Sequence, residues 1–82
     1  MPGVTPVDEG VPWARLRSAA QLGLFLRDAR KRAGLTQAAL ADELGFDRRS
    51  LQRIEAGEPN LYITRVFALV DRLSLELEIR DR

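Results

Sequence analysis

The sequence contains neither cysteine nor histidine. Without cysteine the chain can form no disulfide and no thiolate metal site, and without histidine it lacks the commonest general base and the commonest metal ligand. No paired acidic cluster can be assigned to a cleft, and no cofactor motif is present. We therefore expect a protein that is not an enzyme, with no catalytic residues, no metal site and no cofactor.

Long apolar runs are also missing. Nothing approaches the roughly 20 apolar residues of a membrane span, and the opening MPGVTPVDEGVP lacks the basic-then-apolar order of a signal peptide. These absences predict a cytoplasmic chain without a membrane partner. The 82 residues make one domain, near the lower end of what folds on an ordinary core, so that a partner subunit would help.

Positive and negative charges almost balance each other, with 13 basic and 12 acidic residues and a net charge of +1. Their distribution is uneven: residues 15–32 hold six basic residues and one acid, and three arginines gather in residues 48–53. Half of the acids lie at residues 8–9 and 71–81. We expect a locally basic surface that attracts an anion.

Three helices are predicted from capping residues and apolar periodicity. The first begins at Ser18, where SAAQ matches a capping box, and stops at Gly34. The second opens at the N-cap Thr36 and continues to Gly45, which permits a sharp turn. The third opens at the cap Asp47 and ends at Gly57. The second and third helices are thus joined by a very short turn.

The two ends of the chain carry different signals. Residues 1–14, rich in proline and glycine, are interpreted as a flexible tail in which Trp13 packs locally or contacts a partner. A fourth helix is expected from a cap at Thr64 to Leu73.

The alternation in residues 75–80 indicates a strand, with its apolar row at Leu75, Leu77 and Ile79. We find no second strand in the sequence, and a lone strand leaves its backbone groups unpaired. The row is a frayed tail, a strand lying on its own helices, or a strand pairing with a second copy. The last interpretation satisfies the backbone groups and predicts a homodimer.

The stretch LTQAALADELGFDRRSLQRIEAG resembles the helix-turn-helix of the Cro/C1-type (XRE) repressors, which share a Leu-Thr-Gln opening, a Gly at the turn and Ile-Glu-x-Gly at the close. The terminal helix followed by LSLELEIR resembles HipB-type antitoxins, in which a C-terminal strand pairs across a dimer. The resemblance implies a mainly α, four- to five-helix lambda-repressor-like domain over residues 15–74, followed by a dimerisation strand over residues 75–82.

In a helix-turn-helix the second helix enters the major groove with its N-terminal residues toward the bases. Arg48 and Arg49 follow the cap, Arg53 lies one turn later, and an arginine there can bind guanine O6 and N7. Plain solvation of these arginines, or pairing of Arg53 with an acid, is the alternative. The predicted DNA-binding residues are Thr36, Gln37, Asp47, Arg48, Arg49, Ser50 and Arg53.

The resemblance assigns further roles. It implies that Gln37 contacts phosphate and an outer base, with a plain exposed residue as the alternative, and that Thr36 and Ser50 face phosphate oxygens. Asp47 stands where the family usually has Ser or Thr. A carboxylate repels phosphate unless it accepts from cytosine or pairs with a neighbouring arginine.

Glu55, two residues before Gly57, occupies a position that in the family pairs with an arginine of the first helix. By register that arginine is Arg30, so the resemblance implies a bracing ion pair between Arg30 and Glu55.

These features predict a dimeric repressor that binds an inverted-repeat operator of double-stranded DNA. The resemblance implies, more narrowly, the antitoxin of a HipA-type kinase toxin. A stand-alone phage-type or controller regulator fits the motif as well. The near-zero net charge and Asp47 leave a further alternative, a protein-interaction module that has lost DNA binding.

Overall fold

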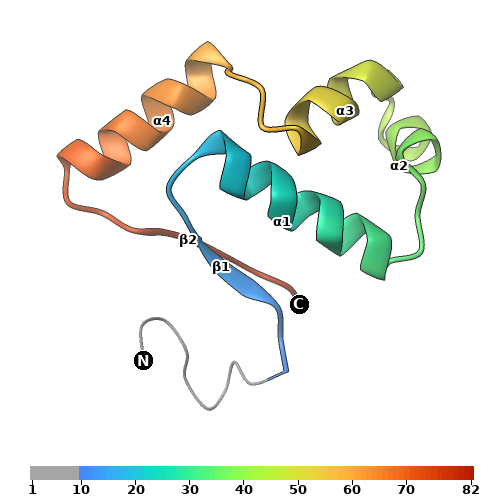
Figure 1. The fold of residues 1–82 in the computed structure, drawn as a ribbon, viewed down its shortest axis with the longest axis horizontal. Coiled ribbons are helices and arrows are strands. Elements are labelled where there is room, and N and C mark those ends of the chain that lie inside the picture. Colours follow the sequence, from blue (N-terminus) through green and yellow to red (C-terminus); the bar gives the residue numbers. More distant parts are fainter. Residues whose placement is uncertain (1–9) are drawn as a thin grey trace.

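The computed structural model describes residues 10–82. Its elements follow in the order β1 (Trp13–Leu16), α1 (Ala19–Arg32), α2 (Gln37–Leu44), α3 (Arg48–Glu55), α4 (Leu61–Arg72) and β2 (Leu77–Arg80). Figure 1 shows α1 at the centre, α2 and α3 at one end, α4 at the other end, and the two strands below. The prediction of a mainly helical domain is confirmed, with four helices in the described part of the chain.

The first three helices begin where their caps predict. Ser18 accepts from the Gln21 amide at 3.2 Å, while the Gln21 side chain reaches back to the amide of Arg17 at 2.6 Å, one residue before the cap. Thr36 accepts from the Ala39 amide at 3.0 Å at the start of α2. A side-chain oxygen in each cap therefore satisfies a helix donor that has no partner within the helix.

The predicted start of α4 at Thr64 is wrong. The helix begins at Leu61, because the side chain of Asn60 accepts from the amides of Tyr62 and Ile63 at 2.9 and 3.2 Å. Thr64 lies inside the first turn, where its amide donates to the carbonyl of Asn60 at 2.9 Å. Asparagine caps a helix at least as well as threonine, so the earlier of the two capping residues starts the helix.

The expectation that the chain holds no second strand is also wrong. β2 pairs antiparallel with β1, in a register that places Trp13 opposite Arg80 and Leu16 opposite Leu77. The backbone groups of β2 on that side are therefore satisfied within one chain. Leu75 lies before β2 and is exposed, whereas Leu77 and Ile79 are half-buried in it. Pairing of β2 with a second copy stays a prediction.

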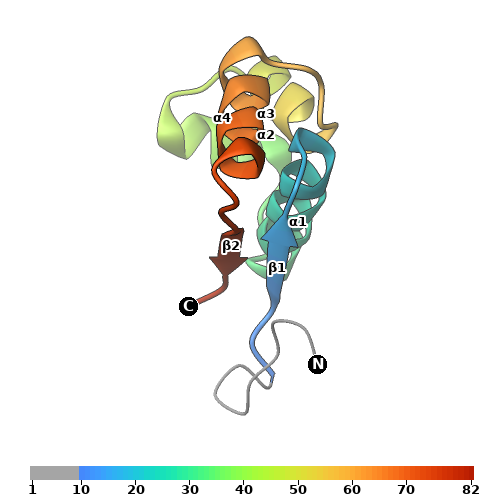
Figure 2. The same ribbon diagram turned by 90° about the vertical axis from the view of Figure 1, so that its left-hand side faces the viewer.

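Contacts beyond the ladder fix the two-stranded sheet to the rest of the chain. Arg15 pairs with Glu76 at 3.2 Å just before β2, and Arg32 at the end of α1 pairs with Asp81 at 3.4 Å just after it. Figure 2 shows the strands side by side near α1. β1 includes Trp13, which the sequence places in the tail of residues 1–14. Residues 1–9 of that predicted tail lie outside the described residues.

The buried side chains belong to α2, α3 and the end of β1. Among the described residues, the apolar side chains that are buried belong to Leu16, Ala41 and Leu51. α1 packs on α3, α2 packs on α3, and β1 packs on α1, whereas α4 shares no extensive contact with another element. The α2–α3 pair is therefore held mainly by α1.

Candidate nucleic-acid interface

α2 and α3 are joined by a three-residue corner. Gly45 ends α2 with φ +74°, a conformation that costs glycine little. The amide of Phe46 then donates to the carbonyl of Ala41 at 2.8 Å, which closes the turn. Asp47 immediately caps α3. These local contacts bring two helices together within a few residues, as a helix-turn-helix requires.

The two sides of α3 differ sharply in exposure. Leu51 and Glu55, one turn apart, are buried toward α1 and α2. Arg48, Arg49 and Arg53 are all exposed. Because the three arginines include the first two residues of the helix, the free N-terminal surface of α3 is positively charged.

Asp47 is held by Ser50 through both of its oxygens. Oδ1 accepts from the Ser50 amide at 2.7 Å, and Oδ2 accepts from the Ser50 hydroxyl at 3.1 Å. These hydrogen bonds, first from the amide and then from the hydroxyl, lower the pKa of Asp47, with further help from the Arg49 amide and the Arg53 charge. Asp47 is therefore a carboxylate at neutral pH, and the hydroxyl hydrogen of Ser50 is already used within the chain.

The start of α2 presents two polar side chains, of which one keeps a free donor and the other is hydrogen-bonded to α3. The exposed Thr36 hydroxyl accepts from the Ala39 amide, which leaves its own hydrogen for an acceptor outside the chain. Gln37 is half-buried, and its Nε2 donates to Oε1 of Glu55 at 3.0 Å. Gln37 is therefore attached to α3, and its orientation is set by Glu55.

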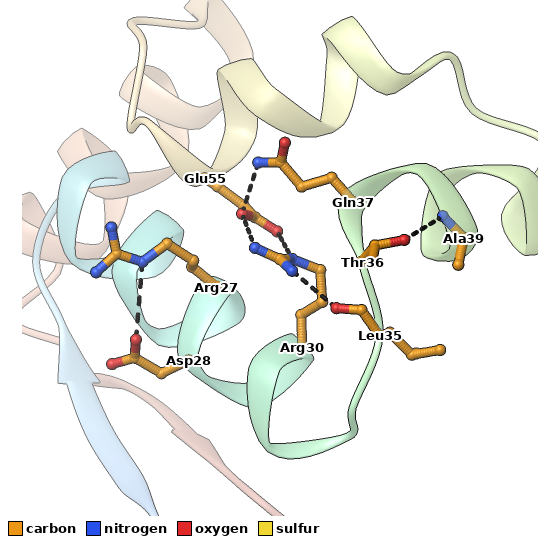
Figure 3. A network of polar contacts seen from close by, with 8 residues as sticks. All are labelled: Arg27, Asp28, Arg30, Leu35, Thr36, Gln37, Ala39 and Glu55. Atoms are coloured by element: carbon orange, nitrogen blue, oxygen red, sulfur yellow. Dashed lines mark hydrogen bonds and ion pairs between the residues drawn. The ribbon is translucent and has the colours of Figure 1, made fainter.

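Arg30 and Glu55 form the ion pair that the resemblance implies (Figure 3). Arg30 Nε donates to Oε2 of Glu55 at 2.7 Å and Nη2 donates to Oε1 at 3.0 Å, a two-pronged contact. Arg30 Nη1 also donates to the Leu35 carbonyl at 2.8 Å. The side chains are only 9% and 3% exposed, so the pair is a buried one.

Glu55 is the centre of this network. The hydrogen bonds from Arg30 are the largest cause that lowers the pKa of Glu55, and the hydrogen bond from Gln37 lowers it further. Burial acts in the opposite direction. The hydrogen bonds to Glu55 likewise raise the pKa of Arg30. A single ionised carboxylate thus connects α1, α2 and α3, and fixes the angle at which α3 is presented.

Gly23 is a structural residue that the sequence did not single out. It is buried in α1, and a Cβ atom there would collide with the backbone carbonyl oxygens of Ile54 and Glu55. Only glycine therefore allows α1 to approach the end of α3 this closely. The available signal was a glycine inside a helical pattern, which usually costs about 1 kcal/mol relative to alanine and so points to a packing reason.

Two exposed basic residues of α1 have acidic partners within the chain. Arg27 lies 3.8 Å from Asp28, and Arg32 pairs with Asp81 and also lies over the Phe25 ring at 5.7 Å. The described residues contain no group of three or more side chains that could hold a metal ion. The arginines that immediately follow the α2–α3 corner are those of α3, and they are exposed.

A braced pair of short helices with a glycine corner, and with the second helix exposing its N-terminal arginines, defines a helix-turn-helix protein. The model of a helix-turn-helix domain family matches residues 21–82. The chain belongs to this family, which supports a DNA-binding regulator as its class.

No curated protein and no solved structure matches the chain at a significant level. Within residues 10–82, no helix combines the length and the apolar character that crossing a membrane requires.

Proposed function

We propose that the protein is a sequence-specific transcription repressor that binds an inverted-repeat DNA operator as a homodimer. The observation that carries the proposal is the exposed, positively charged start of α3, held at a set angle by the Arg30–Glu55 pair. A helix placed in this way fits the major groove with its first turn toward the base edges.

Arg48 and Arg49 are the residues proposed to read bases, with Arg53 one turn further along α3. A two-pronged arginine contact with guanine discriminates by about 1–3 kcal/mol. Thr36 is proposed to donate its free hydroxyl hydrogen to a phosphate. Gln37 serves first to connect α2 to Glu55, and its remaining polar groups are available to the DNA backbone. Ser50 donates both its amide and its hydroxyl hydrogen to Asp47, so it is proposed to reach phosphate by releasing Asp47.

The homodimer is proposed to include β2, whose apolar row holds Leu77 and Ile79 after Leu75. The amide of Asp81 donates to the Pro12 carbonyl at 2.8 Å. Because hydrogen-bonding residues alternate along an antiparallel strand, the backbone of Glu78 then faces away from β1. This outer edge is available to a second β2. Two-fold symmetry requires half-sites spaced by about 10 base pairs or a multiple of that.

A narrower form of the proposal is that the protein is the antitoxin of a HipA-type kinase toxin and represses its own operon. Its support is the resemblance of the α4 and β2 segment to HipB-type antitoxins. A toxin gene next to this one would support it, and a lone gene would favour a stand-alone phage-type or controller regulator.

The function is tested by fluorescence anisotropy with the DNA upstream of the gene and with a scrambled duplex, each titrated across salt. We expect tight binding to the native duplex and a steep loss of affinity with salt, since several phosphates are contacted. The Arg48→Ala, Arg49→Ala double variant should lose the preference for the native duplex. Equal, weak binding to both duplexes overturns DNA reading and favours a protein-interaction module.

A further inference from the structure

α4 carries an apolar stripe that no other part of the described chain covers. Tyr62, Val66, Leu69 and Leu73 recur at intervals of four, three and four residues, which places them along one side of the helix. Their exposed fractions are 77, 44, 59 and 59%. Large apolar side chains left this open in a continuous row mark an interaction surface.

Apart from Tyr62, which also borders one groove of its own chain, the stripe is additional to the face that α4 turns toward that chain. Ile63, Phe67 and Val70 lie beside the stripe on the helix and are half-buried. They line two open grooves, of about 720 and 650 Å³, that separate α4 from β1 and from the α1–α3 body. The apolar arc of α4 is thus wider than the single chain can bury.

The single chain also buries few apolar side chains, which among the described residues are those of Leu16, Ala41 and Leu51. Its Cα atoms extend 36 and 32 Å along the two longer axes and 16 Å along the shortest, so the chain is flat. Figure 2 looks along this flat shape, with α4 toward the viewer. A small domain with so few buried apolar side chains needs additional burial to be stable.

We propose that this stripe is the contact between two copies of the chain, with α4 packed antiparallel against α4 of the second copy. The assignment deepens the homodimer in the proposed function by naming its main surface. The spacing of four, three and four reads the same in both directions. A two-fold axis midway between residues 66 and 69 therefore places Tyr62 opposite Leu73 of the second copy and Val66 opposite Leu69.

The chemistry of the stripe fits a copy of itself. It contains no charged residue, and Arg65 and Arg72 lie at its edge, where they remain in water. Leu61 and Leu75, at the two ends of the segment that carries the stripe, are exposed as well, at 61 and 57%. The chain needs a partner to complete the burial of its apolar side chains. A second copy is available wherever the chain is synthesised.

Sedimentation velocity on the full chain, over a range of concentrations, compares Leu69→Glu with Ala68→Glu. The two residues are neighbours on α4, but Ala68 lies outside the stripe. We expect a dimer for the parent chain and for Ala68→Glu, and a monomer with a lower Tm for Leu69→Glu. A monomeric parent chain, or a dimer that withstands Leu69→Glu, overturns the proposal.

Disulfide trapping keeps the test valid if Leu69→Glu fails to fold, and the chain suits it because it contains no cysteine. Upon mild oxidation, mixed Val66→Cys and Leu69→Cys chains should crosslink faster than a mixture of Val66→Cys and Lys31→Cys chains, since Lys31 is exposed on α1, outside both proposed contacts. Equal crosslinking rates for the two mixtures overturn the proposed contact between the two α4 helices.

The outcome is separable from DNA reading. Arg48→Ala, Arg49→Ala should remain a dimer even if it loses the operator. A dimer that is insensitive to Leu69→Glu but dissociates upon Glu78→Pro, which blocks the outer edge of β2, assigns the contact to the strand and leaves the proposed function intact.

Discussion

The side chain of Gln37, at the first position of α2, donates to the carboxylate of Glu55, at the last position of α3, across 3.0 Å. A residue that the resemblance assigns to DNA is therefore also part of the frame around the Arg30–Glu55 pair. Because Glu55 accepts from α1 and from α2 together, the positions of the DNA-facing groups depend on one buried carboxylate.

Glu55→Ala should lower the free energy of unfolding by about 3 kcal/mol, because removal of one partner leaves the buried Arg30 charge uncompensated. For a domain of this size the Tm should fall by on the order of 10 °C. Thermal unfolding followed by circular dichroism measures the change. Glu58→Ala, which removes an exposed acid nearby, is the matched control and should leave the Tm almost unaltered. Equal Tm values for the parent and Glu55→Ala would exclude a bracing role.

Acid should destabilise the protein through Glu55 and Asp47, whose pKa values are lowered from 4.5 and 3.8 in the folded chain. The unfolded chain then binds more protons, so the stabilisation is complete above these ordinary values and is lost as the pH falls through the lower, folded ones. Urea unfolding from pH 7 to pH 3 should show a constant stability that declines below about pH 4.5. Glu55→Gln should decline less, and an identical decline would remove Glu55 from the account.

Gly23→Ala should destabilise the protein, although alanine favours a helix by about 1 kcal/mol. The added methyl group meets the carbonyl oxygens of Ile54 and Glu55 and pushes α1 away from α3. Overpacking of this kind costs about 1–3 kcal/mol. Chemical denaturation of Gly23→Ala beside Lys31→Ala, an exposed change on the same helix, makes the comparison. A stabilised Gly23→Ala protein would show that the two helices can separate without cost.

Asp47→Asn should strengthen binding to the native and the scrambled duplex alike, by several-fold. Asparagine caps as well as aspartate, and the change removes a negative charge close to the DNA phosphates. The preference for the native duplex should be retained, since both Asp47 oxygens are held by Ser50. Anisotropy at fixed salt measures both affinities. A fall in the preference would instead assign Asp47 to a base.

Much of the α1–α3 region was predictable from the sequence, because its signals are local. Ser18, Thr36 and Asp47 each bind an amide three residues ahead, and a contact of that range is visible in four consecutive letters. The Arg30–Glu55 pair spans 25 residues and was predicted through the family resemblance.

Features that join distant segments were not predictable in this way. Trp13–Leu16 is too short, and its apolar pattern too irregular, to predict a strand. It forms a strand because it pairs with Leu77–Arg80. The start of α4 depended on which of two capping residues, Asn60 or Thr64, the helix uses.

By itself, the sequence determined the caps, the glycine corner between α2 and α3, and the arginines at the start of α3. Each of these depends on neighbours within one or two helical turns. Only the tertiary structure decided that β2 pairs within the chain, that Gly23 admits α3, that Gln37 is attached to Glu55 and that one side of α4 is left open. Those features depend on which surfaces meet in the folded chain, and the spacing of neighbouring residues in the sequence does not predict those contacts.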